Sequence, residues 1–119
     1  MGVSWRQRER GMATAEFAVA LPAVVLVVVV GLTAILTGID QVRCIDSARL
    51  AARALARGDT QADARTLARR AAPVGAAVTL TSSGDLATAT VSVVRRAPVI
   101  GLSWVVRSSA VAPREAVPP

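Results

Sequence analysis

The sequence predicts an α+β protein in which a long N-terminal transmembrane helix extends into an amphipathic helix, followed by a small antiparallel sheet of about three strands. Three observations predict this class. An uncharged apolar run extends from Phe17 to Ile39. Apolar residues then recur every three or four positions as far as Arg57, the period of an amphipathic helix. Beyond Pro73 the period changes to two, which is typical of strands.

Composition limits what the part outside the apolar run can build. The chain has 119 residues, of which 53% are hydrophobic, and outside the run these are largely Ala and Val, which bury little area each. All 14 basic residues are Arg and the net charge is +6, so anionic partners are permitted. Histidine is absent, and Cys44 is the single cysteine, which excludes an internal disulfide and a Cys-rich metal site. We therefore expect a small head domain and no cofactor.

The N-terminal part reads as a leader followed by a membrane anchor. Residues 1–11 are hydrophilic and arginine-rich, and residues 12–39 form the hydrophobic helix. The 23 residues of the apolar run extend about 35 Å as a helix, which is enough to cross the hydrocarbon layer. A removed signal peptide is the alternative, but its apolar region is normally shorter and ends in a small-residue cleavage site. Pro22 lies inside the span and should kink it.

The basic residues of the leader favour a cytoplasmic N-terminus, because positive charge is retained on the inner side. We therefore expect a single-pass protein of the cytoplasmic membrane, in contact with membrane lipid, with its C-terminal domain outside.

A carboxylate stands at the start of this span, in the stretch RGMATAEF. Glu16 follows Gly11 by five positions and directly precedes Phe17. A basic leader, a Gly, an acid at this spacing and a spanning helix resemble the processing site of type IV prepilins. With Pro22 and the Ala- and Arg-rich helix that follows, residues 6 to about 59 resemble the TadE-like minor pilins, or pseudopilins, of the tight-adherence (Tad/Flp, type IVc) pilus in high-GC Gram-positive bacteria.

This resemblance implies how the chain is processed and assembled. Prepilin peptidase would cut between Gly11 and Met12, which makes Glu16 the fifth mature residue. Glu16 and Phe17 would then act in subunit assembly with other Tad pilins and the pilus assembly machinery, on the membrane or in a cell-surface pilus. A carboxylate beside the new amine of a neighbouring subunit would favour correct register, because an unpaired charge in low dielectric is costly.

Residues 40–72 are expected to form amphipathic helices. In the first, Val42, Ile45, Ala48, Ala52 and Leu55 form the apolar face. A row of arginines at four-residue spacing, at positions 49, 53 and 57, indicates a solvated face. Gly58 is a helix stop, and Thr60 begins a capping box for a second helix that ends before Pro73. Cys44 is interpreted as a small buried residue, with an intersubunit disulfide as the alternative.

Residues 73–112 are expected to form a small β-meander. Val78 and Leu80 alternate with threonines, and so do Ala87, Ala89 and Val91, with turn-forming residues at 82–85 between the two runs. A third strand from about residue 103 to 112 carries Trp104, which we interpret as a core or interface residue. Residues 113–119 read as a flexible tail.

An enzyme is the poorest fit, because the sequence offers no His, no paired carboxylates and no phosphate-cradling glycine loop. A minor pilin fits best. The alternative is a single-pass membrane-anchored protein whose basic ectodomain binds an anionic surface polymer or DNA, although nucleic acid is not favoured because no binding site is recognisable.

Overall fold

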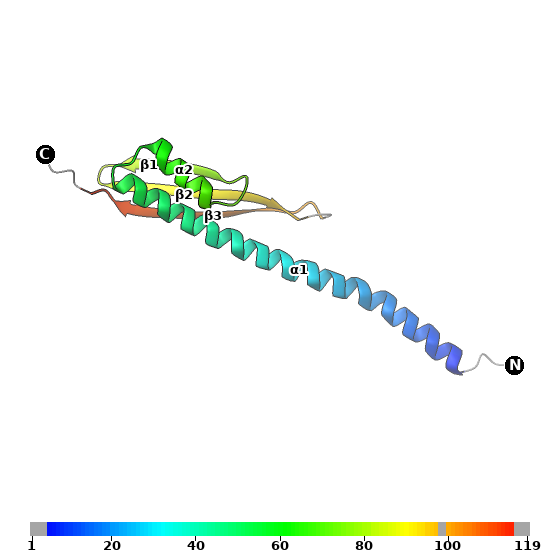
Figure 1. Ribbon diagram of the computed structural model, residues 1–119. Coiled ribbons are helices and arrows are strands. Elements are labelled where there is room, and N and C mark those ends of the chain that lie inside the picture. The colour runs from blue at the N-terminus through cyan, green and yellow to red at the C-terminus, as the bar shows by residue number, and fades with distance from the viewer. Residues whose placement is uncertain (1–4, 98–99, 116–119) are drawn as a thin grey trace. The chain divides into compact units, whose positions relative to one another are not determined.

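The computed structural model describes residues 5–97 and 100–115 (Figure 1). The elements follow in the order α1 (Trp5–Ala56), α2 (Gln61–Ala71), β1 (Ala77–Ser83), β2 (Leu86–Arg96) and β3 (Ser103–Pro113). The predicted α+β class is confirmed, with a long apolar N-terminal helix, a second helix and a three-stranded antiparallel sheet. Contacts divide the chain into two units, Met1–Ile35 and Leu36–Pro119.

The first unit contains the N-terminal part of α1. This helix is long and apolar enough to cross a membrane, and none of its most apolar window is buried within the chain. It begins at Trp5, inside the predicted leader, whose residues 1–4 lie outside the described part. The Arg, Gln and Glu residues that follow Trp5 favour helix, which explains the early start. The helix continues through Pro22, whose ring nitrogen cannot donate a backbone hydrogen bond.

The second unit opens with the remainder of α1 and the short helix α2. α1 ends at Ala56, and Gly58 adopts a positive φ of 97° just beyond it, as the predicted stop requires. Thr60 caps α2, because its hydroxyl oxygen accepts a hydrogen bond from the Asp63 N–H at 3.1 Å. The buried Ser47 hydroxyl of α1 donates to the Ala68 carbonyl of α2 at 2.7 Å. With the short connection between them, this contact makes the two helices antiparallel neighbours.

The sheet is an antiparallel meander in the order β1-β2-β3, as predicted. Ser83 pairs with Leu86 across a two-residue turn, in which Gly84 supplies the positive φ of 58°. The last strand extends into the first residue of the predicted tail, 113–119. β3 includes Pro113, and the next two N–H groups, of Arg114 and Glu115, donate to the carbonyls of Asp85 (2.6 Å) and Ala56 (3.0 Å). Residues 116–119 of that tail lie outside the described part.

The core lies between the helices and one face of the sheet. Side chains alternate along β2, so that every second residue from Ala87 to Val93 is buried. Most of the core is alanine; its buried members in the two helices are Cys44, Ala48, Ala51, Ala52, Ala54, Leu55, Ala64 and Ala68.

The predicted apolar face of α1 was partly wrong. Val42 is 58% exposed, whereas Cys44 and Ser47 are fully buried. The buried face of α1 consists mainly of small side chains, which let α1 approach its neighbours closely. The most hydrophobic side chains are not all on this face.

Candidate functional site

The predicted cleavage site lies within α1. Gly11 has open space around its Cα, and Met12 is 67% exposed, so both are accessible from the side. Their backbone is helical, however, and its amides and carbonyls are engaged along the helix axis. A peptidase that binds an extended substrate would have to unwind this first part of α1. Glycine lowers the cost of unwinding because it destabilises a helix by about 1 kcal/mol relative to alanine.

Glu16 lies just over one helical turn beyond Met12 and is exposed. Small apolar side chains form a shallow hollow on one side of it, including Ala15, Ala20 and Ala23. On the other side the lining includes larger side chains, those of Phe17, Leu21 and Val24. Phe17 itself is 69% exposed. Among the described residues, no cation pairs with the Glu16 carboxylate. The structure therefore presents an acceptor group within an uncovered apolar helix surface.

An ion pair at the start of the head was missed by the sequence analysis. Arg95, on the core side of β2, donates from Nε to Asp40 Oδ2 at 2.7 Å and from Nη2 to Asp40 Oδ1 at 2.9 Å. These hydrogen bonds hold the pKa of Asp40 below its usual value and outweigh the opposing effect of burial. The partners are 55 positions apart, but Arg95 continues the inward alternation of β2, which was a usable signal.

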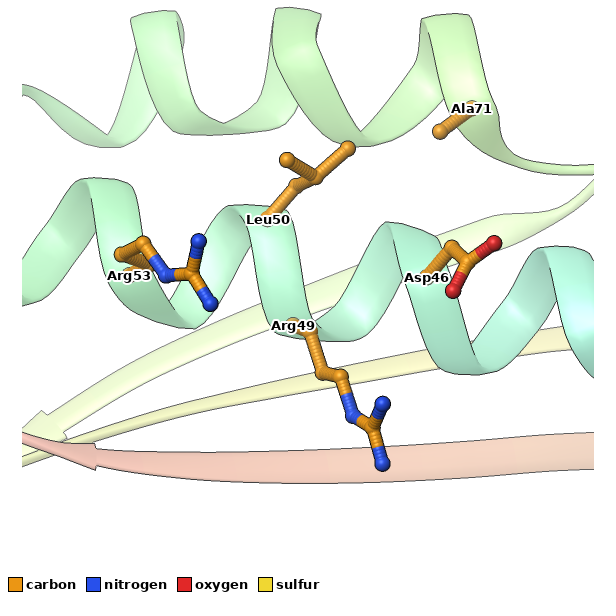
Figure 2. Close-up of a pocket in the computed structure, with 5 residues that line it drawn as sticks. All are labelled: Asp46, Arg49, Leu50, Arg53 and Ala71. Carbon is orange, nitrogen blue, oxygen red and sulfur yellow. The ribbon is translucent and has the colours of Figure 1, made fainter.

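A depression between α1 and α2 is lined by Asp46, Arg49, Leu50, Arg53 and Ala71 (Figure 2). Figure 2 shows Leu50 pointing from α1 toward α2, while the charged side chains spread along α1. The arginine row is exposed, which confirms the predicted solvated face, and Arg57 pairs with nearby Asp59 at 3.3 Å. The charged side chains that line this depression do not point toward a common centre, as those of a catalytic or ligand-binding site would (Figure 2).

Other reactive groups of the head are enclosed. Cys44 is fully buried, as expected for a small core residue, and burial raises the pKa of its thiol. Trp104 packs against the core, and its Nε1 is buried without a hydrogen-bond partner. Across residues 5–97 and 100–115, no cluster of three or more His, Cys, Asp or Glu side chains could hold a metal ion.

Comparison with known proteins gives one curated relative. The chain is 44% identical over 77 residues to "Apoptosis inhibitor Rv3655c" of Mycobacterium tuberculosis (strain ATCC 25618 / H37Rv). The match covers 65% of this chain and 61% of the relative, so the chain spans less than two thirds of that protein's length. No protein-family model matches the chain. No solved structure matches it either.

Proposed function

We propose that this chain is a TadE-like minor pilin or pseudopilin, anchored in the cytoplasmic membrane by α1 with its head outside. Prepilin peptidase removes residues 1–11, and the mature subunit takes part in the assembly or initiation of a Tad-type pilus. Gly11 and Met12 are the cleavage site, Glu16 and Phe17 are assembly residues, and Pro22 kinks the helix. Its partners are the peptidase, other pilins and the membrane.

One observation carries the proposal: an exposed carboxylate stands on an uncovered apolar helix, five positions after an accessible glycine. In lipid, the hydrophobic effect does not drive apolar helices together, because lipid tails are as apolar as the helix surface. Close packing and polar pairing therefore decide which helices associate. A carboxylate in that setting is expensive and is expected to seek a cation.

Cleavage after Gly11 would supply such a cation. The new ammonium group on Met12 lies about 6 Å along the helix axis from Glu16 of the same chain, at 1.5 Å per residue. A neighbouring helix displaced by roughly that distance would bring its own amine level with Glu16. Pairing between chains therefore selects one stagger, and stackings that leave either charge unpaired cost several kcal/mol.

The first test is the N-terminal sequence and intact mass of the protein from native membranes, in cells with and without prepilin peptidase. We expect a start at Met12 that depends on the peptidase. An intact Met1 terminus in both strains would contradict the proposal and favour a plain membrane anchor with a basic ectodomain.

The second test addresses Glu16. Replacing it with Gln keeps its size and removes its charge, so we expect membrane insertion to persist while co-purification with other pilins falls. The matched control is Glu9→Gln, which lies in the same helix but in the part removed by cleavage. Equal co-purification for both variants would refute the assembly role.

The similarity to a protein named as an apoptosis inhibitor favours a second candidate function, inhibition of apoptosis. Its test is direct. Cultured cells receive an apoptosis inducer with or without the purified chain, and caspase activation is measured. Suppression that survives Glu16→Gln would indicate an activity of the head that is separate from pilin assembly.

A further inference from the structure

One end of the second unit is defined by the contact between Asp40 and Arg95. Asp40 directly follows the apolar run, and Arg95 stands near the end of β2. β2 therefore runs toward the end at which α1 enters the head, and the connection from β2 to β3 lies beyond Asp40 on that side.

The described residues of this connection, 97 and 100–102, form the tip of the hairpin. The Ala97 N–H donates to the Leu102 carbonyl at 2.7 Å, so the two chain segments stay paired beyond the strands. Ile100 and Leu102 are each 61% exposed, and Arg96 beside them is also exposed. The segment contains Pro98 and Gly101, residue types that turns favour, but Ile100 and Leu102 are large apolar residues, which turns in water do not favour. The composition of this tip indicates that something apolar covers it.

The same end of the head is basic. α2 runs antiparallel to α1, which brings the C-terminal end of α2 back to the level of Arg43. A hollow forms there, lined by Arg43, Arg69, Arg70 and residues 72–76, with no acidic side chain in its lining. Val74, in the same segment, is 88% exposed. Three guanidinium groups and exposed apolar side chains thus share one end of the unit.

We propose that this end of the head docks on the anionic face of the bilayer that α1 crosses. The side chains of Ile100 and Leu102 enter the headgroup region, and the three arginines of the hollow contact lipid phosphates. The inference rests on the proposed membrane anchor. Chain continuity selects the bilayer over another protein, because no linker separates the apolar run from Asp40, and the hairpin continues past Arg95, the partner of Asp40, through Arg96 and Ala97.

The test uses the full chain in vesicles of phosphatidylcholine with phosphatidylglycerol. In a Cys44→Ala background, a polarity-sensitive fluorophore is attached at Leu102→Cys, and quenching by brominated lipid is measured. Two matched positions serve as controls. The first is Val27→Cys, since Val27 lies in the apolar run and is 70% exposed. The second is Leu86→Cys, since Leu86 lies at the far end of β2 and is 49% exposed. We expect blue-shifted, quenched emission at Leu102 and Val27 and neither effect at Leu86.

Other results separate the possible failures. Quenching at Val27 without quenching at Leu102 would overturn the docking and leave the anchor intact. No quenching at any position would contradict both the proposed membrane anchor and the proposed docking. Equal quenching at Leu86 and Leu102 would refute an end-on contact.

The arginine contacts are tested with the triple variant R43Q/R69Q/R70Q, carrying the label at Leu102. Each arginine near an anionic surface is expected to favour the docked state about fivefold. The triple variant should therefore lose most of the quenching in anionic vesicles, and the parent should lose it in vesicles of phosphatidylcholine alone. Unchanged quenching in both cases would contradict a role for lipid charge.

Discussion

Replacing Asp40 with Asn tests whether the Asp40 and Arg95 pair holds the sheet to α1. Asn keeps the shape of the side chain but removes its charge, so Arg95 loses both charge-assisted hydrogen bonds. The Asp40 side chain is only 11% exposed, while that of Arg95 is 35% exposed. The pair is thus intermediate between exposed pairs, worth at most about 1 kcal/mol, and buried pairs, which cost about 3–5 kcal/mol to break. We expect the variant to lose about 2 kcal/mol of unfolding free energy.

The assay is thermal unfolding of the full chain in detergent, followed by near-ultraviolet circular dichroism. For a head of this size, a loss of about 2 kcal/mol lowers Tm by roughly 10 °C. The matched control is Asp59→Asn, which breaks the exposed pair of Asp59 and Arg57 and should change stability by less than about 1 kcal/mol. A double-mutant cycle with Arg95→Gln isolates the interaction between Asp40 and Arg95. A coupling energy near zero, or equal losses for Asp40→Asn and Asp59→Asn, would refute the reasoning.

The pH dependence has a definite sign. Because the pKa of Asp40 is lowered in the folded state, its contribution is complete above the unfolded-state pKa, about 3.9. The contribution is lost as the pH falls through the lower folded-state pKa. Wild type and Asp40→Asn should therefore differ by a constant amount near neutral pH and converge in acid. A difference that instead disappeared as the pH rose would contradict the assigned cause.

Three further predictions follow from local contacts. Cys44 should resist alkylation at pH 8 in the folded chain and react on unfolding, as measured by mass spectrometry; rapid labelling or a disulfide-linked dimer would contradict its burial. Ser47→Ala should cost about 1 kcal/mol in thermal unfolding, because the Ala68 carbonyl loses a buried donor; an unchanged Tm would show that the hydrogen bond contributes nothing net. Gly11→Ala should slow peptidase processing by stabilising the helix, whereas Gly31→Ala should not, as pulse-chase gels would reveal.

The elements were predictable where the pattern of the chain is local. Apolar and polar residues alternate on either side of Gly84, which predicts the hairpin. Thr60 predicts the start of the second helix, and Pro73 predicts its end. These signals act within a few residues, so tertiary contacts did not need to be known. The helix that begins at Trp5 was not expected, because the leader was read only for its charge.

The buried face of α1 was less predictable because hydrophobicity was the wrong criterion for it. Val42 faces outward, while Cys44 and Ser47 face the core, where close approach of the backbones matters more than side-chain area. The alternation of β2 places Arg95 on the inner face of the sheet, but its pairing with Asp40 depends on how the sheet is placed on the helix, which no local pattern encodes. By contrast, Gly11 and Glu16 were singled out by their spacing together with the basic leader, the span and the resemblance to prepilins, and their roles in cleavage and assembly stay predictions.

The alanine-rich core has a consequence for how this protein can change over time. Alanine loses no rotamer entropy on burial, so the head can be stable with little buried area per residue. At positions such as Ala51 and Ala89, which are fully buried, every substitution except glycine enlarges the side chain. Overpacking typically costs about 1–3 kcal/mol, and glycine in a helix or strand is also destabilising. During evolution, amino-acid substitutions should therefore accumulate on the exposed face of the sheet, while the side-chain volume of the layer between helix and sheet stays constant.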